Sequence, residues 1–404
     1  MNIIEGGVCA PKGFKAGGIH CGIRKNRTKR DLALIISEKK ATAAATYTTN
    51  LVKGAPLTVT KANIADGFAQ AVICNSGNAN TCNANGIEIA EEMCNLVSEA
   101  TGIDAKDVVV ASTGVIGEPL SIEPIKSGMA ELFESVSSDG NLAAAEAIMT
   151  TDTKVKSIAV SFEIDGVECK IGGIAKGSGM IHPNMATMLV FITTDCAISS
   201  EMLSKALSSD ITETFNMISV DGDTSTNDMV TVLANGMAGN AEITAENEAF
   251  STFMKALNTV TVHLCRSIAA DGEGATKLLE CKVEGAQSLS TAKAAAKAVI
   301  CSSLLKAAMF GADANWGRVL CAIGYGTTDV DVEKVDVSFK SSKGQVDVCK
   351  SGAGIPFSEE KAKEILLEDE IEILINLNNG EYFSTAWGCD LTYDYVKING
   401  DYRT

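Results

Sequence analysis

The sequence predicts an α/β protein with a smaller second domain. Segments with the features of strands, turns and helices alternate along the chain, which favours a layered α/β organisation. Residues 156–171 alternate cleanly between apolar and polar positions around Asp165-Gly166, a pattern typical of a β-hairpin. At 404 residues the chain exceeds one ordinary domain, so two domains or one large layered domain are expected.

Apolar runs and helical spacing predict the elements of the first half. Strands are expected at 32–36, 43–48, 70–74, 108–110 and, as the hairpin, 156–171. Helices are expected at 87–100, which Gly102 should end, and at 121–136 and 141–149.

The second half predicts further strands, helices and a change of domain. Strands are expected at 188–192, 229–233, 277–283, 332–349, 370–377 and 381–387, and helices at 200–216, 244–268 and 290–310. Because residues 288–380 run from helix to strands by themselves, they are predicted to form the smaller second domain. The main domain is expected in 1–186 and 187–287, with 381–404 as a C-terminal segment.

Charge and cysteine content indicate which partners are disfavoured and which cellular compartment is expected. The net charge of −17 argues against nucleic acid or an anionic membrane as a partner. Thirteen cysteines without a Cys-x-x-Cys pair are typical of reduced thiols in a cytosolic protein. The N-terminus has no secretory pattern, and no run approaches the ~18 apolar residues of a membrane helix, so a cytoplasmic protein is expected.

Residues 172–192 are the most informative stretch for function. A Gly-rich loop leads through His182 and Pro183 to Thr187, which opens an apolar strand. We expect the Thr187 hydroxyl to be a nucleophile, with its own α-amine as base if the Ala186–Thr187 bond is cut. An N-to-O acyl shift followed by ester hydrolysis would make that cut. By itself, an ordinary threonine at a strand start remains the better interpretation.

Phosphate and metal binding are weaker interpretations. Lys176-Gly177-Ser178-Gly179 lacks the order of a P-loop and precedes a strand rather than a helix. No early Gly-x-Gly-x-x-Gly predicts dinucleotide binding. The three histidines lack ligand spacing, and the carboxylates of residues 221, 223 and 228 match a calcium loop only loosely, so a hydrogen-bonded turn is favoured there.

A Ser-His-Asp triad is the second interpretation of the catalytic residues. Ser178 or Ser112 would be the nucleophile and His182 the base, but no Gly-x-Ser-x-Gly elbow is present. His182 beside Pro183 is more typical of a structural hydrogen-bonding residue than of a base.

The motif at 176–189, Lys-Gly-Ser-Gly-Met-Ile-His-Pro-Asn-Met-Ala-Thr-Met-Leu, resembles the signature of the ornithine acetyltransferase family, the glutamate N-acetyltransferases of arginine biosynthesis. Further blocks resembling that family lie in order at 113–114, 150–156, 270–277, 311–318 and 399–404. The resemblance therefore extends from the first third of the chain to its last residue.

The resemblance implies a self-cleaving acyltransferase. The precursor would cut between Ala186 and Thr187, and the pieces 1–186 and 187–404 would assemble as two of each. Thr187 would take an acetyl group from N2-acetylornithine and pass it to glutamate by ping-pong kinetics, in the cyclic pathway of arginine biosynthesis. No cofactor or metal is expected, and acetyl-CoA is left open as a second donor. The implied fold is an α/β layered sandwich resembling N-terminal-nucleophile hydrolases, with a smaller second domain.

Roles at the site follow from the same resemblance. Thr187 matches the nucleophile, and its freed α-amine, with a reference pKa of ~7.7–8.0, would be the base. Thr113 and Gly114 match the family's pair of oxyanion donors. Substrate binding falls at these positions: Thr153, Lys176, Thr187, Glu273, Asn399 and Thr404. Lys176 suits the shared α-carboxylate and Glu273 a cationic amine.

Two rivals remain. A related self-processed amidase or aminopeptidase would pass the acyl group to water instead of glutamate. A non-catalytic binding module would keep the fold and leave the chain uncut.

Overall fold

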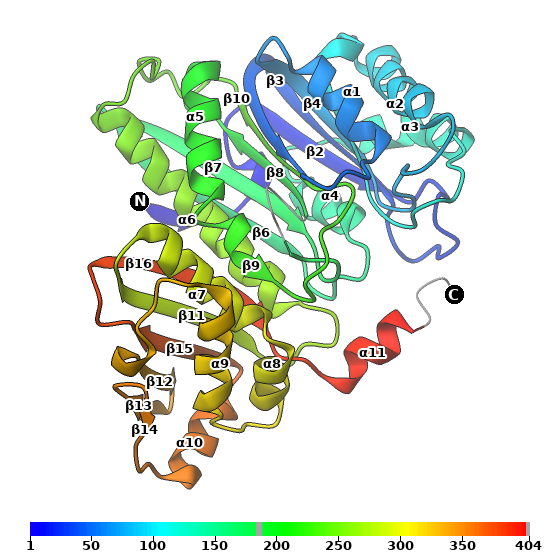
Figure 1. The fold of residues 1–404 in the computed structure, drawn as a ribbon. Helices are drawn as coiled ribbons and strands as arrows, with labels where there is room; N and C mark the ends of the chain where they lie inside the picture. Colours follow the sequence, from blue (N-terminus) through cyan, green and yellow to red (C-terminus); the bar gives the residue numbers. More distant parts are fainter. Residues whose placement is uncertain (183–187, 401–404) are drawn as a thin grey trace. The chain divides into compact units, whose positions relative to one another are not determined.

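The computed structural model describes residues 1–182 and 188–400, which fold as two compact units (Figure 1). The first unit holds Met1–Gly177, 188–212 and Thr224–Leu264, and the second holds 178–182, Glu213–Asp223 and 265–400. Each unit contains one sheet, which confirms the predicted mixed α/β class with a second, smaller sheet-bearing part.

The described residues of the first unit form a nine-stranded sheet. Its strand order is β1-β6-β7-β8-β10-β3-β4-β5, and β2 pairs with β3. The strands are β1 (Asn2–Ile4), β2 (Phe14–Ile19), β3 (Leu32–Tyr47), β4 (Phe68–Asn75), β5 (Val108–Ser112), β6 (Lys156–Ile164), β7 (Val167–Lys176), β8 (Leu189–Thr194) and β10 (Met229–Ala234). Two predicted strands, 32–36 and 43–48, are wrong as separate elements because β3 runs unbroken through both.

Helices pack on both faces of the sheet of this unit, because successive side chains of its strands point to opposite faces and are apolar on each. In β3, Leu32 and Leu34 belong to the cluster shared with α2 and α3, while Ala33 and Ile35 belong to the cluster shared with α4. The helices are α1 (Ala55–Asn63), α2 (Gly86–Thr101), α3 (Glu123–Ser135), α4 (Asn141–Ile148), α5 (Ser200–Ile211) and α6 (Glu248–Ala270), of which residues 265–270 belong to the second unit. Gly102 ends α2 with a left-handed φ of 77°, as predicted.

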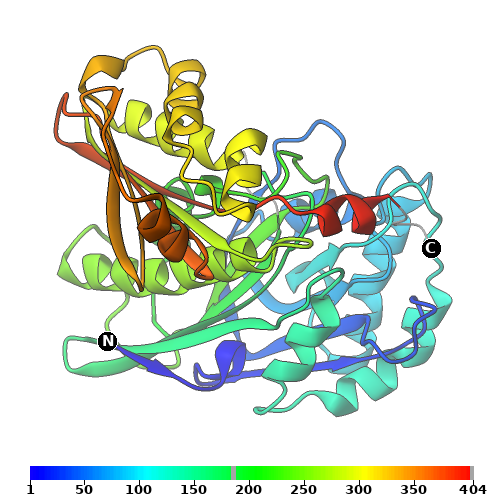
Figure 2. The ribbon, with the colours of Figure 1, turned by 90° about the horizontal axis from the view of Figure 1, so that it is seen from below.

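The predicted hairpin is confirmed and determines the register of the central strands. β6 pairs with β7 around Asp165 and Gly166, both at positive φ, and Figure 2 shows the hairpin beside the N-terminal strand β1. β7 then pairs with β8, placing Lys176 opposite Leu189. Lys176 therefore lies beside the strand that begins two residues after Thr187 in the sequence.

The second unit has a seven-stranded sheet within its described residues. Its order is β14-β13-β12-β15-β11-β16-β9. The strands are β9 (Ile218–Ser219), β11 (Leu278–Ala286), β12 (Asp336–Ser341), β13 (Gly344–Lys350), β14 (Ala353–Gly354), β15 (Glu370–Asn376) and β16 (Tyr382–Cys389). The helices are α7 (Leu289–Cys301), α8 (Ser303–Phe310), α9 (Trp316–Gly326), α10 (Glu359–Leu366) and α11 (Tyr393–Asn399).

Two predicted helices differ from the structure, one because a cap divides it and one because it ends earlier. The single helix predicted at 290–310 is wrong, because Ser302 takes an extended conformation and its hydroxyl accepts the N–H of Leu305, which starts α8. The helix predicted at 200–216 ends at Ile211. Short 3-10 turns occur at Gly7–Cys9, Ala105–Asp107, Phe215–Met217 and Val332–Lys334. Within the described ranges, no helix is both long and apolar enough to span a membrane.

Candidate active site

The predicted site residues fall into three groups, and each unit is described by itself. The first unit holds Thr113, Gly114, Thr153 and Lys176, and the second holds Glu273 and Asn399. The remaining predicted positions, Ala186, Thr187 and Thr404, lie outside the described residues.

The Thr113-Gly114 turn follows β5 and is shaped by its neighbours. The Thr113 N–H donates to the carbonyl oxygen of Asn75 at 2.9 Å. Gly114 has a φ of 132°, and a Cβ there would lie 2.8 Å from the backbone nitrogen of Asn78 and the carbonyl carbon of Gly77. Only glycine fits this conformation and this close backbone approach, so the predicted oxyanion pair stands on a tightly constrained turn.

Two buried asparagines hold the end of β5 in place. Asn75 Nδ2 donates to the Ser112 hydroxyl at 2.7 Å. From a loop far along the chain, Asn227 Nδ2 donates to the Ser112 carbonyl at 2.9 Å, and its Oδ1 accepts the Thr81 hydroxyl at 2.5 Å. Because buried amides with satisfied donors and acceptors are rigid, these side chains fix the strand end that leads into Thr113. Their role could not be predicted from the sequence, because polar residues in loops are usually solvated.

Lys176 brings a positive charge to the same turn. The residue is 8% exposed, and its Nζ lies 3.4 Å from the Thr113 hydroxyl oxygen, at the long end of a hydrogen bond. The structure therefore brings together two residues that were predicted separately, a carboxylate-binding cation and an oxyanion donor.

A buried ion pair fixes the residue that follows Lys176. The Asp152 carboxylate lies 2.7 Å from Lys156 Nζ and accepts the Gly177 N–H at 2.7 Å. Burial acts to raise the pKa of Asp152, but the charges of Lys156 and Lys176 and the Gly177 hydrogen bond outweigh it and hold the pKa below its usual range. Thr153, the predicted substrate contact, is the exposed residue next to this pair.

Asp228 is another of the buried carboxyls of the first unit. It is 3% exposed, and its Oδ2 has no hydrogen-bond partner within the described part of the chain. Burial raises its pKa well above the usual value, against the lowering effects of a Ser225 hydrogen bond and the Lys176 charge, so the protonated form is favoured. The N–H of the next residue, Met229, donates to the carbonyl oxygen of Met188 at 2.8 Å.

In the second unit, Glu273 and Asn399 are in direct contact. Glu273 is 7% exposed, and its Oε2 accepts from Asn399 Nδ2 at 2.7 Å. The Glu273 N–H donates to the Ser178 carbonyl at 2.9 Å. A Cβ on Gly179 would lie 2.4 Å from the Glu273 carboxyl carbon, so this carboxylate packs directly against the glycine. Two predicted substrate contacts thus form one polar pair.

The C-terminal helix α11, which ends at Asn399, docks on the turn that carries Glu273. The Thr392 hydroxyl donates to the Gly274 carbonyl at 2.6 Å, and the Tyr395 hydroxyl donates to Asp221 Oδ2 at 3.3 Å. The Phe310 and Tyr393 rings meet edge to face at 5.8 Å between centroids. These contacts fix the position of Asn399 within the second unit.

The triad interpretation gains no support. Nδ1 of His182 lies 3.1 Å from the Ser219 hydroxyl and 3.5 Å from Cys301 Sγ, whereas the Ser178 hydroxyl donates to the Asp271 carbonyl at 2.6 Å. Burial, followed by the charge of Lys297, lowers the pKa of His182, which favours its neutral form. These contacts are consistent with the structural role that the sequence favoured for this histidine.

The metal interpretation is not supported by the described residues either. Within residues 1–182 and 188–400, no group of three or more His, Cys, Asp or Glu side chains is arranged to hold a metal ion. The Asp221 carboxylate instead accepts backbone N–H groups of Met180 and Ile181, as expected for a hydrogen-bonded turn.

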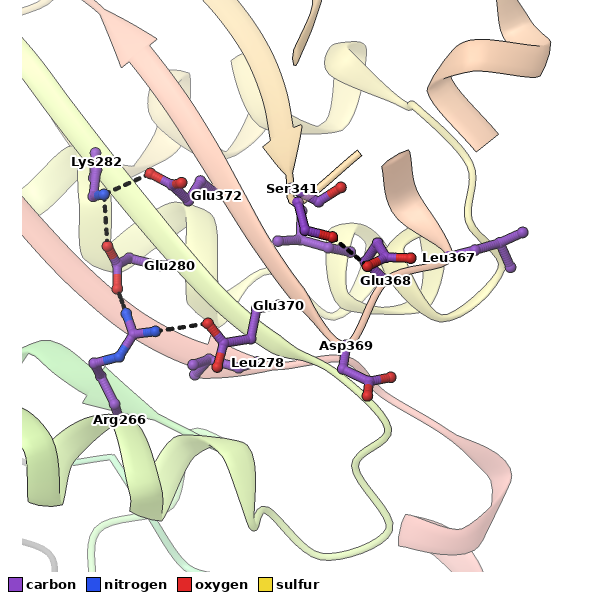
Figure 3. A pocket seen from close by; sticks show the side chains of 12 residues that line it. Arg266, Leu278, Glu280, Lys282, Ser341, Leu367, Glu368, Asp369, Glu370 and Glu372 are labelled. Atoms are coloured by element: carbon purple, nitrogen blue, oxygen red, sulfur yellow. Dashed lines mark hydrogen bonds and ion pairs between the residues drawn. The ribbon is translucent and has the colours of Figure 1, made fainter. Parts of the chain in front are cut away.

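A cavity of about 520 Å³ lies in the second unit and is lined by ion pairs (Figure 3). Lys282 Nζ lies 2.8 Å from Glu280 and 2.5 Å from Glu372, and Arg266 pairs with Glu280 and Glu370. None of the predicted site residues that lie in the described ranges lines this cavity. Both cationic side chains of the lining, Arg266 and Lys282, are already paired with carboxylates, and we do not assign the reaction to this cavity.

Comparison with known proteins identifies the relatives of the chain. The ArgJ family pattern matches residues 15–404. The arginine biosynthesis bifunctional protein ArgJ of Caldanaerobacter subterraneus subsp. tengcongensis is 51% identical over 405 residues, covering 100% of both chains. ArgJ 1 of Clostridium acetobutylicum is 51% identical, covering 97% of this chain and 96% of its own length.

One solved relative is also similar in structure. The crystal structure of the arginine biosynthesis bifunctional protein of Bacillus halodurans is 47% identical, with a TM-score of 0.50. The match covers 52% of this chain and 97% of that one.

These matches define the chain as an acyltransferase of arginine biosynthesis. It belongs to the ArgJ family, which confirms the resemblance drawn from the motif at 176–189 and the blocks that flank it.

Proposed function

We propose that the chain cuts itself between Ala186 and Thr187 and then transfers an acetyl group from N2-acetylornithine to glutamate through an acetyl-threonine intermediate. The main support is the position of Lys176. Its ammonium lies 3.4 Å from the Thr113 hydroxyl, and its backbone pairs with Leu189, two residues after the proposed nucleophile. The β7–β8 pairing thus puts Lys176, and with it the proposed oxyanion turn, beside the strand that follows Thr187 in the sequence, which supports the proposal.

The proposed self-cleavage needs no cofactor. The Thr187 hydroxyl oxygen attacks the Ala186 carbonyl, the peptide C–N bond breaks, and the nitrogen takes the proton to become the α-amine. Water then hydrolyses the resulting ester, which restores the hydroxyl and leaves a carboxylate on Ala186. The Thr113 hydroxyl and the Gly114 N–H stabilise the oxyanion, the kind of contribution whose loss typically costs ~10²–10³ in rate.

The same hydroxyl then carries the acetyl group. Thr187, with its α-amine as base, attacks the acetyl carbonyl of N2-acetylornithine, and ornithine leaves with the proton. Glutamate attacks the ester in the second half-reaction and leaves as N-acetylglutamate. We assign binding of the α-carboxylate that both substrates share to Lys176. The cationic amine of the substrate is assigned to Glu273 with Asn399. Thr153 and Thr404 are assigned further polar contacts with the substrate.

The length of the solved relative supports a two-piece enzyme. The Bacillus halodurans chain is matched over 97% of its length, yet it covers 52% of this chain. The proposed cut would leave a second piece of 404 − 186 = 218 residues, about half of the 404-residue chain. Two copies of each piece, assembled in the cytoplasm, complete the proposal.

The curated relatives are named bifunctional. We therefore include acetyl-CoA in the proposal as a second acetyl donor, through which the enzyme would make N-acetylglutamate without N2-acetylornithine.

Acetyl transfer is tested with purified enzyme and labelled N2-acetylornithine. Label should appear in N-acetylglutamate only when glutamate is present, and free acetate should stay at background. Acetate released at the same rate with or without glutamate would instead identify an amidase. Acetyl-CoA with glutamate alone tests the second donor, and no product there would remove it.

A further inference from the structure

Asp221 forms hydrogen bonds with two segments of the second unit that are far apart in sequence. Its Oδ2 accepts the Met180 N–H at 2.6 Å, and its Oδ1 accepts the Ile181 N–H at 2.9 Å. The Tyr395 hydroxyl of α11 donates to Oδ2 at 3.3 Å, and the Asp223 N–H donates to Oδ1 at 3.3 Å. Both oxygens are therefore in use, each with more than one donor.

The turn held by Asp221 has a demanding backbone conformation. Met180 has a φ of 56°, a left-handed conformation that side chains other than glycine rarely adopt. Its neighbour Ile181 is 1% exposed, and the Ile181 carbonyl accepts the Val220 N–H at 2.7 Å. Hydrogen bonds to a charged acceptor are stronger than neutral ones, so the carboxylate is well suited to hold this conformation.

The Tyr395 contact extends the same link to α11. Burial, followed by the negative charge of Asp221, raises the pKa of Tyr395, so the phenol stays protonated and can donate. One further turn along α11, Asn399 donates to Glu273. The helix bearing Asn399 and the turn at 180–181 therefore share one carboxylate.

We propose that Asp221 is a positioning residue for two steps: it sets the turn that precedes the segment to be cut, and through Tyr395 it sets the helix that presents Asn399 to Glu273. The inference rests on the proposed function, because it assigns processing to the first link and recognition of the substrate amine to the second. Asp221 itself has no role in bond making in this proposal.

The test compares Asp221→Asn with the matched control Asp223→Asn and with Tyr395→Phe. Asparagine has the same shape but offers one acceptor oxygen instead of two, and its NH₂ group faces an N–H donor. Self-cleavage of Asp221→Asn, followed as a first-order rate constant, should slow by about ten-fold or more. Asp223, an exposed neighbour, should tolerate the same change with the wild-type rate.

Tyr395→Phe separates the second link from the first. It should cut at the wild-type rate, and after processing its KM for N2-acetylornithine should rise about three- to ten-fold, while kcat stays within about two-fold. If these residues had only a structural role, both variants would lower the melting temperature, but Asp221→Asn would not selectively slow cutting and Tyr395→Phe would not selectively raise KM. Equal cutting rates for Asp221→Asn and Asp223→Asn would overturn the first link, and an unchanged KM would overturn the second.

Hydrogen exchange makes the test independent of processing. The Met180 and Ile181 amides should exchange faster in Asp221→Asn than in Asp223→Asn, and equal exchange would refute the positioning role. If the wild-type chain is not cut before Thr187, the proposed function fails, and the exchange rates still decide whether Asp221 holds the turn.

Discussion

Removing Asp152 should destabilise the first unit more than removing its partner Lys156. Both side chains are essentially unexposed, at 0% for Asp152 and 1% for Lys156, and their charged atoms lie 2.7 Å apart. Asp152→Ala leaves a buried ammonium without its carboxylate, which typically costs about 3–5 kcal/mol. It also removes the acceptor of the Gly177 N–H.

The opposite change is predicted to cost less. In Lys156→Met the Asp152 carboxylate keeps the N–H groups of Thr150 and Gly177 as donors, and the charge of Lys176 still favours its ionised form. We expect a cost of about 1.5–3 kcal/mol, the range for losing one hydrogen bond to a charged group. At about 2–4 °C per kcal/mol for a domain of this size, Asp152→Ala should lower Tm by roughly 6–20 °C.

Thermal melts of the wild type, the two single variants and the double variant measure these costs. The double variant should be more stable than Asp152→Ala, because it no longer buries an unpaired charge. The KM of the double variant for both substrates should nevertheless be higher than that of the wild type. The reason is that the Gly177 N–H, next to Lys176, has lost its hydrogen-bond acceptor in both variants that lack Asp152. A Lys156→Met variant as unstable as Asp152→Ala would refute this reasoning.

The remaining predictions concern acid stability and two glycines. The pKa of Asp152 in the folded state lies below its unfolded value of about 3.9, so its contribution to stability is complete above that value and disappears as pH falls through the folded pKa. Below about pH 4, Tm should therefore fall less steeply with pH in Asp152→Asn than in the wild type. Parallel curves of Tm against pH would contradict this. Gly179→Ala should raise KM for N2-acetylornithine by about ten-fold or more, because its Cβ would displace the Glu273 carboxylate. Gly114→Ala should cost about 1–3 kcal/mol of stability and slow acetyl transfer by ~10²–10³, since it strains the turn and moves the proposed oxyanion donor. Gly324→Ala, which meets open space, is the control for both and should leave kinetics unchanged.

Local patterns predicted the elements whose determinants are themselves local. The hairpin at 156–171 followed from alternation and from Asp165-Gly166, and the end of α2 followed from Gly102. The break between α7 and α8 was missed, because helical spacing continues through it and only the hydroxyl of Ser302 marks it. Helix α9 (Trp316–Gly326) was not predicted at all.

The site could be predicted only in part, for a physical reason. The resemblance predicted Lys176 and Glu273 as site residues, and the structure adds the groups that contact them or their neighbours in the chain. Asn227 contacts Ser112, 115 residues away in the chain, and no local spacing shows such a partner. Asp152 and Asp221 likewise have the sequence context of ordinary turn residues, and only their burial and hydrogen bonds distinguish them.

The most direct test is the mass of the purified protein before and after brief exposure to N2-acetylornithine. Two pieces are predicted, residues 1–186 and 187–404, and the second should become one acetyl group heavier at its N-terminal threonine. Thr187→Ala should remain a single uncut chain and take up no acetyl group. An intact wild-type chain, a cut at another bond, or acetyl on a residue other than Thr187 would contradict the proposal that one threonine is both cut site and acetyl carrier.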